Sequence, residues 1–166
     1  MSNNVITTRP IGSDTAPPSA TEPDVDLGML PDLIGYHVRL AQMAIFADFA
    51  AALAELDLSP GLFALLVIVE ANPGLKQTRL AVAARLDRST LVPALDKLEA
   101  RALVERRAAP NDRRSNGLFL TASGSGLLVK AKAAVRAHEA QIAAGLSQPS
   151  RRRLIELLDS LAPSRR

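Results

Sequence analysis

The chain has no cysteine and only two histidines among its 166 residues. The absence of cysteine excludes disulfide bonds, zinc sites built on thiolates and thiol redox switches. Two histidines without cysteine also leave no recognisable metal-ligand cluster and no nucleophile–base pair in the sequence. We therefore expect no metal cofactor and no enzymatic activity.

Aromatic residues and long apolar runs are also scarce. Aromatic residues make up 3% of the chain, and the apolar run at 62–69 is far below the ~18 residues that a membrane span requires. Residues 1–8 have neither a basic start nor an apolar core, so no signal peptide is predicted. The hydrophobic content of 48%, rich in Leu and Ala, is typical of a helical core, and we expect one cytoplasmic domain without membrane contact.

Acidic residues nearly balance the basic ones, so the net charge of +3 argues only weakly for a nucleic-acid partner. Four arginines nevertheless gather in one short segment: Arg106, Arg107, Arg113 and Arg114. A local basic patch bears on nucleic-acid binding more than the net charge does.

The stretch from residue 75 to residue 121 has the most informative pattern. It begins with a short helix that is predicted to end near Leu86, and residues 87–90 offer capping side chains for a second helix. An apolar stripe at i, i+4 and i+7 follows on this second helix, formed by Leu91, Leu95 and Leu98. Brief strand-like runs at 103–107 and 118–120 flank the turn-rich segment 108–117, which predicts a hairpin. A helix-turn-helix followed by a hairpin wing is a DNA-reading layout, with the second helix in the major groove.

The helices on either side of this stretch are predicted from their caps and apolar spacing. A first helix, apolar on most sides, runs from about Pro31 to about residue 55, and Ser59 caps a second that stops at 72–74. Thr121 or Ser123 begins a long helix that reaches about residue 145, and Ser150 caps the last one. A helix apolar on most sides needs cover from outside its own domain, so a partner subunit is expected.

A family resemblance rests on a set of positions around the predicted wing: Leu80-Ala81, Asp87–Thr90, Leu95–Glu99, Leu103-Val104, Asn111–Ser115, Leu120-Thr121 and Gly124. In these positions the chain resembles the MarR family of bacterial transcription regulators, over about residues 31–162. The Asp-x-Arg tip that begins at Asp112 is the most specific of them. The chain departs from the family at Arg85 and Ala102, where the family usually has glycine in turns that favour positive φ. Pro93, inside the second helix, predicts that this helix starts late or bends.

The resemblance implies a mainly α fold, a winged helix-turn-helix with added N- and C-terminal dimerisation helices. Residues 1–28, poor in groups that can be buried, form a disordered tail, and residues 29–166 form the MarR-like winged-helix domain. Within that domain, the DNA-reading head covers residues 57–121, and the dimerisation helices cover 29–56 and 122–166. A homodimer on double-stranded operator DNA is the expected assembly.

The DNA-binding candidates fall in three groups. On the second helix they are Arg88, Ser89, Thr90, Pro93 and Lys97, expected to face base edges or phosphates. At the start of the preceding helix, Gln77 and Thr78 are placed to meet a phosphate at its positive end. At the wing tip, Asp112 is expected to hold the arginine fork, and Arg113 or Arg114 to enter the minor groove. The alternatives are an ordinary amphipathic surface helix and a solvated hairpin tip.

The resemblance also implies an effector pocket where the dimerisation helices meet the head. The candidate lining residues are Tyr36, His37, Arg39, Leu40, Met43, Phe46, Phe63 and Val67. They form an apolar box in which His37 or Arg39 meets an anionic group, such as that of an aromatic acid or its CoA thioester. The alternative is a partly exposed helix with satisfied polar groups, and His138 is expected to be a packed residue rather than a ligand.

The expected function is that of a repressor released from a palindromic operator by a small aromatic acid or an aryl-CoA thioester. A different class of function stays open, that of a winged-helix adaptor whose wing binds a protein without sequence-specific DNA readout.

Overall fold

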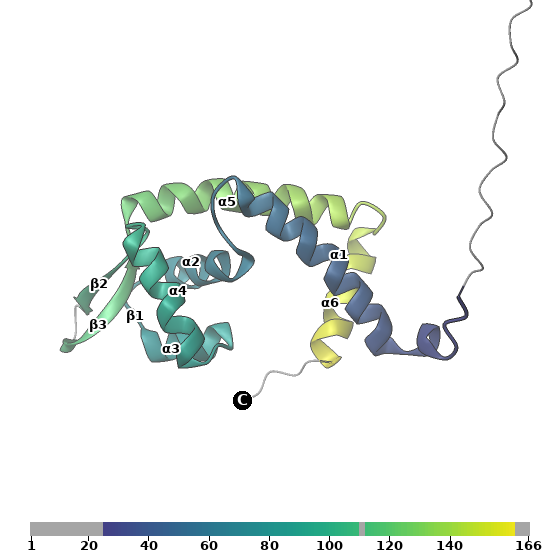
Figure 1. The fold of residues 1–166 in the computed structure, drawn as a ribbon. Helices are drawn as coiled ribbons and strands as arrows, with labels where there is room; N and C mark the ends of the chain where they lie inside the picture. The colour runs from purple at the N-terminus through teal and green to yellow at the C-terminus, as the bar shows by residue number, and fades with distance from the viewer. Residues whose placement is uncertain (1–24, 110–111, 162–166) are drawn as a thin grey trace, which may run out of the picture. The chain divides into compact units, whose positions relative to one another are not determined.

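Helix is the main secondary structure in the described residues, 25–109 and 112–161, of the computed structural model (Figure 1). Side chains at 108–115 fall outside this description. The helices are η1 (Leu30–Asp32), α1 (Ile34–Ala54), α2 (Pro60–Ala71), α3 (Gln77–Ala84), α4 (Arg88–Ala100), α5 (Ala122–Ile142) and α6 (Gln148–Leu161). The strands are β1 (Leu75–Lys76), β2 (Val104–Ala109) and β3 (Asp112–Leu120). The chain divides into two units, Met1–His37 and Val38–Arg166.

The first unit contains the start of the predicted first helix, which differs from the expectation. Pro31 lies in the single 3-10 turn η1, and α1 begins only at Ile34. Leu33 separates the two helices because its backbone is extended, with φ −96° and ψ 123°. The ring of His37 hydrogen-bonds the Pro31 carbonyl oxygen at 2.7 Å and packs edge-on against Tyr36. The predicted disordered tail lies, as far as residue 24, outside the described residues.

The core of the second unit is built almost entirely from leucine. The predicted stripe of α4, Leu91, Leu95 and Leu98, is buried to 1% exposure or less. Helices α1, α2, α3 and α5 and strands β2 and β3 each contribute at least one fully buried side chain to the same cluster, including Leu53, Leu66, Leu80, Leu118 and Leu128. Burial of a leucine side chain contributes about 1.5–3 kcal/mol. The face of each helix turned to this cluster therefore decides which residues remain in solvent.

Local capping sets the starts of the helices, as the sequence indicated at two of four positions. At residues 87–90, Asp87 is the N-cap of α4, but its side chain makes no capping hydrogen bond. The Ser59 hydroxyl accepts a hydrogen bond from the Leu62 N–H at 3.3 Å, and the Thr121 hydroxyl accepts one from the Gly124 N–H at 2.9 Å. The predicted cap Ser150 is wrong, because α6 begins at Gln148 and the hydroxyl of Ser147 accepts the Ser150 N–H. A capping hydroxyl stands two or three residues before the N–H that it accepts, which places Ser150 inside the first turn.

Two features of the helix-turn-helix concern backbone conformation. Arg85 and Ala102 have φ of 54° and 51°, so the turns on both sides of α4 do adopt the left-handed conformation that the missing glycines indicated. The predicted late start of α4 is wrong, because α4 begins at Arg88 and continues through Pro93. The hydrogen bond that this proline cannot make is the one to Ser89, in the first turn, and the later turns keep theirs.

The three strands form one antiparallel sheet in the order β1-β3-β2. The sequence placed residues 108–117 in the turn, but most of them are strand, and only 110–111 separate β2 from β3. Strand β1 was not predicted, because it has two residues and pairs far along the chain, with Leu75 opposite Leu118. At this pairing, a Cβ on Gly117 would lie 2.6 Å from the Gly74 carbonyl oxygen, so the close approach requires glycine.

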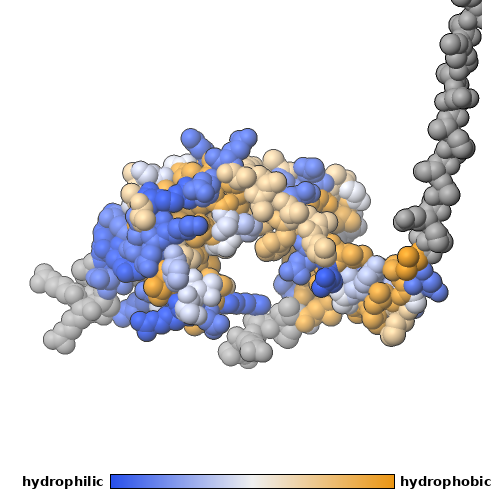
Figure 2. All heavy atoms as spheres, viewed as in Figure 1, coloured by the Kyte–Doolittle hydropathy of each residue, from blue (hydrophilic) through white to orange (hydrophobic). Residues whose placement is uncertain are grey.

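Apolar side chains cover much of the surface of α1 and α6 in the single chain. On α1 the exposed ones are Ile34, Val38, Leu40, Met43, Ile45 and Phe46, and on α6 they are Leu154, Ile155, Leu157, Leu158 and Leu161. Figure 2 shows hydrophilic residues gathered instead over α4 and the hairpin. Helix α1 has the length and hydropathy of a membrane span, a test that core helices of soluble proteins also pass.

Candidate nucleic-acid interface

The face of α4 opposite its leucine stripe is open to solvent. Ser89, Thr90, Pro93 and Lys97 are all exposed, and so is Arg88 at the first position of the helix. Burial of the stripe fixes the rotation of α4 about its axis, so these side chains form one continuous polar and basic surface. The five residues predicted on this helix are therefore brought together.

The start of α3 lies beside this surface. Thr78 is exposed and Gln77 is half-buried, and both line a hollow of about 250 Å³ together with Ala81, Arg88 and Leu91. The backbone N–H groups in the first turn of a helix lack intrahelical acceptors and attract anions. The predicted pair thus adjoins Arg88, and the three polar side chains can address one phosphate group.

The wing is joined to α4 by an ion-pair cluster that was not predicted from the sequence. The Arg106 guanidinium on β2 lies 3.1 Å from the Glu99 carboxylate and 3.6 Å from the Asp96 carboxylate, both on α4. Arg106 was counted in the basic patch, but its charge is directed at these two carboxylates. The sequence did not reveal this pairing, because the two acidic residues lie on α4 whereas their partner lies on β2.

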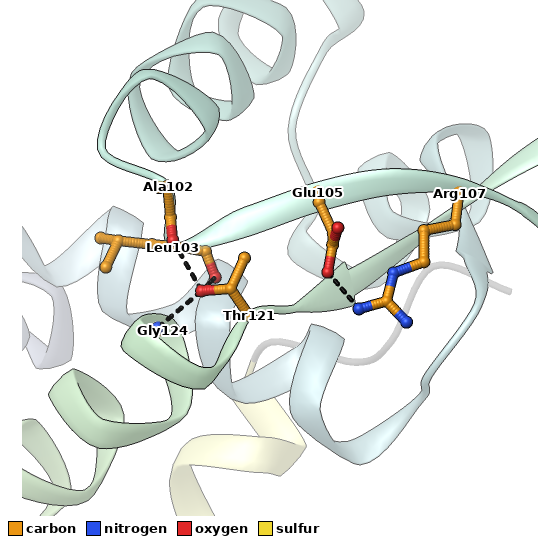
Figure 3. Close-up of polar contacts among 6 residues, drawn as sticks. All are labelled: Ala102, Leu103, Glu105, Arg107, Thr121 and Gly124. Atoms are coloured by element: carbon orange, nitrogen blue, oxygen red, sulfur yellow. Dashed lines mark hydrogen bonds and ion pairs between the residues drawn. The ribbon is translucent and has the colours of Figure 1, made fainter.

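Arg107 has a different environment on the same strand. Its guanidinium donates a hydrogen bond to the Glu105 carboxylate (Figure 3). The same guanidinium lies 5.4 Å from the centre of the Phe119 ring. The hydrogen bond lowers the pKa of Glu105 and raises the pKa of Arg107. Both groups stay ionised at neutral pH, so this part of the wing carries a fixed arginine over an aromatic face.

The base of the wing is closed by Thr121. Its hydroxyl donates to the Ala102 carbonyl oxygen at 2.6 Å and accepts from the Gly124 N–H, which joins the end of α4 to the start of α5 (Figure 3). A Cβ on Gly124 would lie 2.0 Å from the Leu103 carbonyl oxygen, so this contact excludes any larger residue. The family position at Gly124 thus has a steric reason.

The predicted tip residues are only partly described. Asp112, Arg113 and Arg114 belong to β3 by their backbone, but their side chains lie outside the described part of the chain. Their roles in holding the tip and entering the minor groove remain predictions.

The predicted ligand residues are divided between the two units. Tyr36 and His37 belong to the first unit. In the second, Arg39, Leu40, Met43 and Phe46 are exposed on α1, whereas Phe63 and Val67 are partly buried against the core from α2. Their assembly into one pocket remains a prediction.

A hollow of about 380 Å³ between α1 and α5 was not predicted. It is lined by Asp48, Ala51, Ala52, Ala134, Ala137, His138 and Gln141, mostly small side chains that give little signal in a sequence. His138 is buried and stacks on the Phe49 ring with the centroids 5.4 Å apart, in line with its expected packed role.

A helix-turn-helix whose second helix is exposed on one face, with a β-hairpin tied to it, defines a winged-helix DNA-binding protein. The MarR family model matches residues 58–115. A protein of Thauera aromatica, named as a transcriptional regulatory protein for the hcr operon, is 36% identical over 81% of this chain and 81% of its own length. The chain belongs to the MarR family of transcriptional regulators.

Solved structures of family members resemble the chain closely. The repressor CouR bound to a 23-mer DNA duplex has a TM-score of 0.79 and 36% identity, over 84% of this chain and 99% of that one. CouR bound to p-coumaroyl-CoA has a TM-score of 0.76 and 34% identity, over 84% and 99%. The Mycobacterium tuberculosis protein Rv2887 in complex with salicylic acid has a TM-score of 0.62 and 32% identity, over 78% and 96%.

Proposed function

We propose that this chain is a cytoplasmic, ligand-responsive repressor that binds operator DNA as a homodimer and has no enzymatic activity. The observation that carries the DNA-binding part is the exposed face of α4, with its wing held beside it by Arg106. Solved structures of relatives contain a DNA duplex, p-coumaroyl-CoA or salicylic acid, which supports the same two classes of partner here.

The assembly on DNA follows from the geometry of the duplex. A palindromic operator presents two half-sites about 34 Å apart, so two copies of α4 are needed on one face of the duplex. The exposed apolar side chains of α1 and α6 supply a surface for the second copy, because such a surface is costly in water. In each copy α4 enters the major groove, and Asp112, Arg113 and Arg114 direct the wing tip to the minor groove.

The effector is an aromatic carboxylic acid or its CoA thioester. Tyr36, Leu40, Met43, Phe46, Phe63 and Val67 line its apolar site, and Arg39 or His37 binds the anionic group. A charge-assisted hydrogen bond from arginine to a carboxylate or phosphate is about twice as strong as a neutral one. A ligand that binds the free dimer better than the DNA-bound dimer must release the operator.

The test is a mobility-shift titration with the DNA that flanks the protein's own gene, against scrambled DNA of equal length. We expect a specific complex that p-coumaroyl-CoA or salicylate disrupts, whereas CoA alone does not. Failure of the chain to distinguish the two DNAs would favour the adaptor function instead. Specific binding that neither compound affects would leave the repressor and overturn the effector class.

A further inference from the structure

Arg101, the first residue after α4, reaches across to the segment between α1 and α2. Its guanidinium donates a hydrogen bond to the Leu56 carbonyl oxygen at 3.0 Å and another to the Asp57 carbonyl oxygen. It also lies 3.6 Å from the Asp57 carboxylate. One side chain thus joins two elements that are 44 residues apart in sequence.

The segment that receives these bonds is the tightly wound end of α1. The Asp57 N–H donates to the Ala54 carbonyl at 2.9 Å and the Leu58 N–H to the Leu53 carbonyl at 3.3 Å, with Asp57 left-handed at φ 49°. Free carbonyl groups at a helix C-terminus carry partial negative charge, which an arginine neutralises. The guanidinium therefore holds the end of α1 through its backbone.

The other end of the bridge is equally constrained. The Arg101 N–H donates to the Lys97 carbonyl at 3.3 Å, and the Ala102 N–H donates to the Glu99 carbonyl at 2.8 Å. Ala102 then turns the chain away from α4 with its left-handed backbone. A displacement of the guanidinium consequently acts on the last turn of α4, the helix with the exposed DNA-facing surface.

We propose that Arg101 is the positioning residue that transmits movement of α1 to α4, and hence couples effector binding to DNA release. This inference rests on the proposed function. Leucines of both helices also share one core, but apolar contacts have no preferred direction, whereas a two-carbonyl fork does. The Asp57 side chain is 92% exposed, so water screens its ion pair and the carbonyl bonds carry the coupling.

The first arm of the test needs no ligand. Amide hydrogen exchange is measured on the full chain for wild type, Arg101→Ala, Arg101→Lys and Asp57→Asn. Arg136→Ala, which removes an exposed arginine of α5, is the charge-matched control. In Arg101→Ala, amides 56–58 and 97–103 should lose protection together, and Arg101→Lys should restore it only in part, since lysine lacks the fork. Asp57→Asn and Arg136→Ala should match wild type.

The second arm measures operator affinity with and without saturating p-coumaroyl-CoA, and the affinity of the free protein for this compound. The release ratio is the operator affinity without the compound divided by the operator affinity with it. In Arg101→Ala this ratio should fall by about threefold or more, within the range known for mutations along coupling networks. The affinity of the DNA-free variant for p-coumaroyl-CoA should stay within about twofold of the wild-type value, because Arg101 does not contact the compound.

The two arms separate the inference from the function on which it rests. A wild-type protein that does not bind the operator specifically, or does not bind the compound, contradicts the proposed function. The hydrogen-exchange experiment would then still test whether Arg101 joins the two segments. Loss of protection at 56–58 with unchanged protection at 97–103 would overturn the inference, and so would an unchanged release ratio in Arg101→Ala.

Discussion

The Arg106 guanidinium on β2 lies 3.1 Å from the Glu99 carboxylate on α4. Asp96, one turn earlier on the same helix, faces the same guanidinium at 3.6 Å. A wing arginine that would otherwise be attributed to DNA binding thus serves to set the angle between the wing and α4. The basic patch consequently contains a positioning arginine, Arg106.

Replacement of Arg106 by alanine should weaken operator binding without changing its dependence on salt. Affinity should fall by about three- to thirtyfold, as for other indirect contacts. The slope of log affinity against log salt should stay unchanged, because Arg106 neutralises carboxylates and no phosphate. Fluorescence anisotropy at several salt concentrations measures both quantities. Glu99→Gln should reproduce the affinity loss, and a reduced slope in Arg106→Ala would instead make Arg106 a phosphate contact.

The tip arginines should behave in the opposite way. Arg113→Ala with Arg114→Ala removes two charges expected to reach the DNA, so the salt slope should fall by ~0.9 for each lost phosphate contact. The same anisotropy series measures it, with Arg136→Ala as the control for charge alone. An affinity and a slope equal to those of wild type would show that the tip is a solvated hairpin without DNA contact.

The oligomeric state should depend on α6. Sedimentation velocity of the wild type at micromolar concentration should give the mass of a dimer, because α1 and α6 leave large apolar side chains in solvent in one chain. Leu154→Lys with Leu158→Lys should give a monomer. Neither residue belongs to the leucine core, so circular dichroism should report unchanged helix in the head. A wild-type monomer that still binds the operator specifically contradicts the dimer.

The anchor for the effector is tested with Arg39→Ala. Calorimetry with salicylate, p-coumaroyl-CoA and CoA alone should show affinity reduced by about tenfold or more for the aromatic anions, the worth of a lost hydrogen bond to a charged group. Arg39→Lys should recover part of it. If Arg39→Ala binds the active compound as tightly as wild type, His37 or another group is the anchor.

Ala102→Gly should stabilise the protein by about 1 kcal/mol, because a left-handed backbone costs alanine energy that glycine does not spend. Thermal unfolding should shift upward by about 2–4 °C for a chain of this size. Gly124→Ala should destabilise by about 1–3 kcal/mol or more, since its Cβ has no room beside Leu103. A lower melting temperature for Ala102→Gly would show that φ 51° carries no strain there.

Local patterns were sufficient for much of the fold. The buried stripe of α4 and the caps at Ser59 and Thr121 follow from residues within one or two turns of each other, and the sequence contains all of that information. The positive φ of Arg85 and Ala102 could also be predicted, because related sequences usually have glycine at these positions and glycine favours positive φ. The winged-helix layout and the exposed residues of α4 could therefore be predicted.

Pairings between distant segments could not be predicted from the sequence. Strand β1 exists only because Leu75 meets Leu118, and two residues are too few to form a pattern of their own. Arg106 faces Glu99 and Asp96 only once β2 turns back along α4, and Arg101 meets Leu56 and Asp57 only once α1 and α4 share one core. The sequence by itself determined most of the helices, the caps at Ser59 and Thr121 and the exposed face of α4, because these depend on neighbours along the chain. Tertiary structure alone decided that Arg101 and Arg106 hold separate elements together, because an ion pair or a hydrogen bond depends on distance in space.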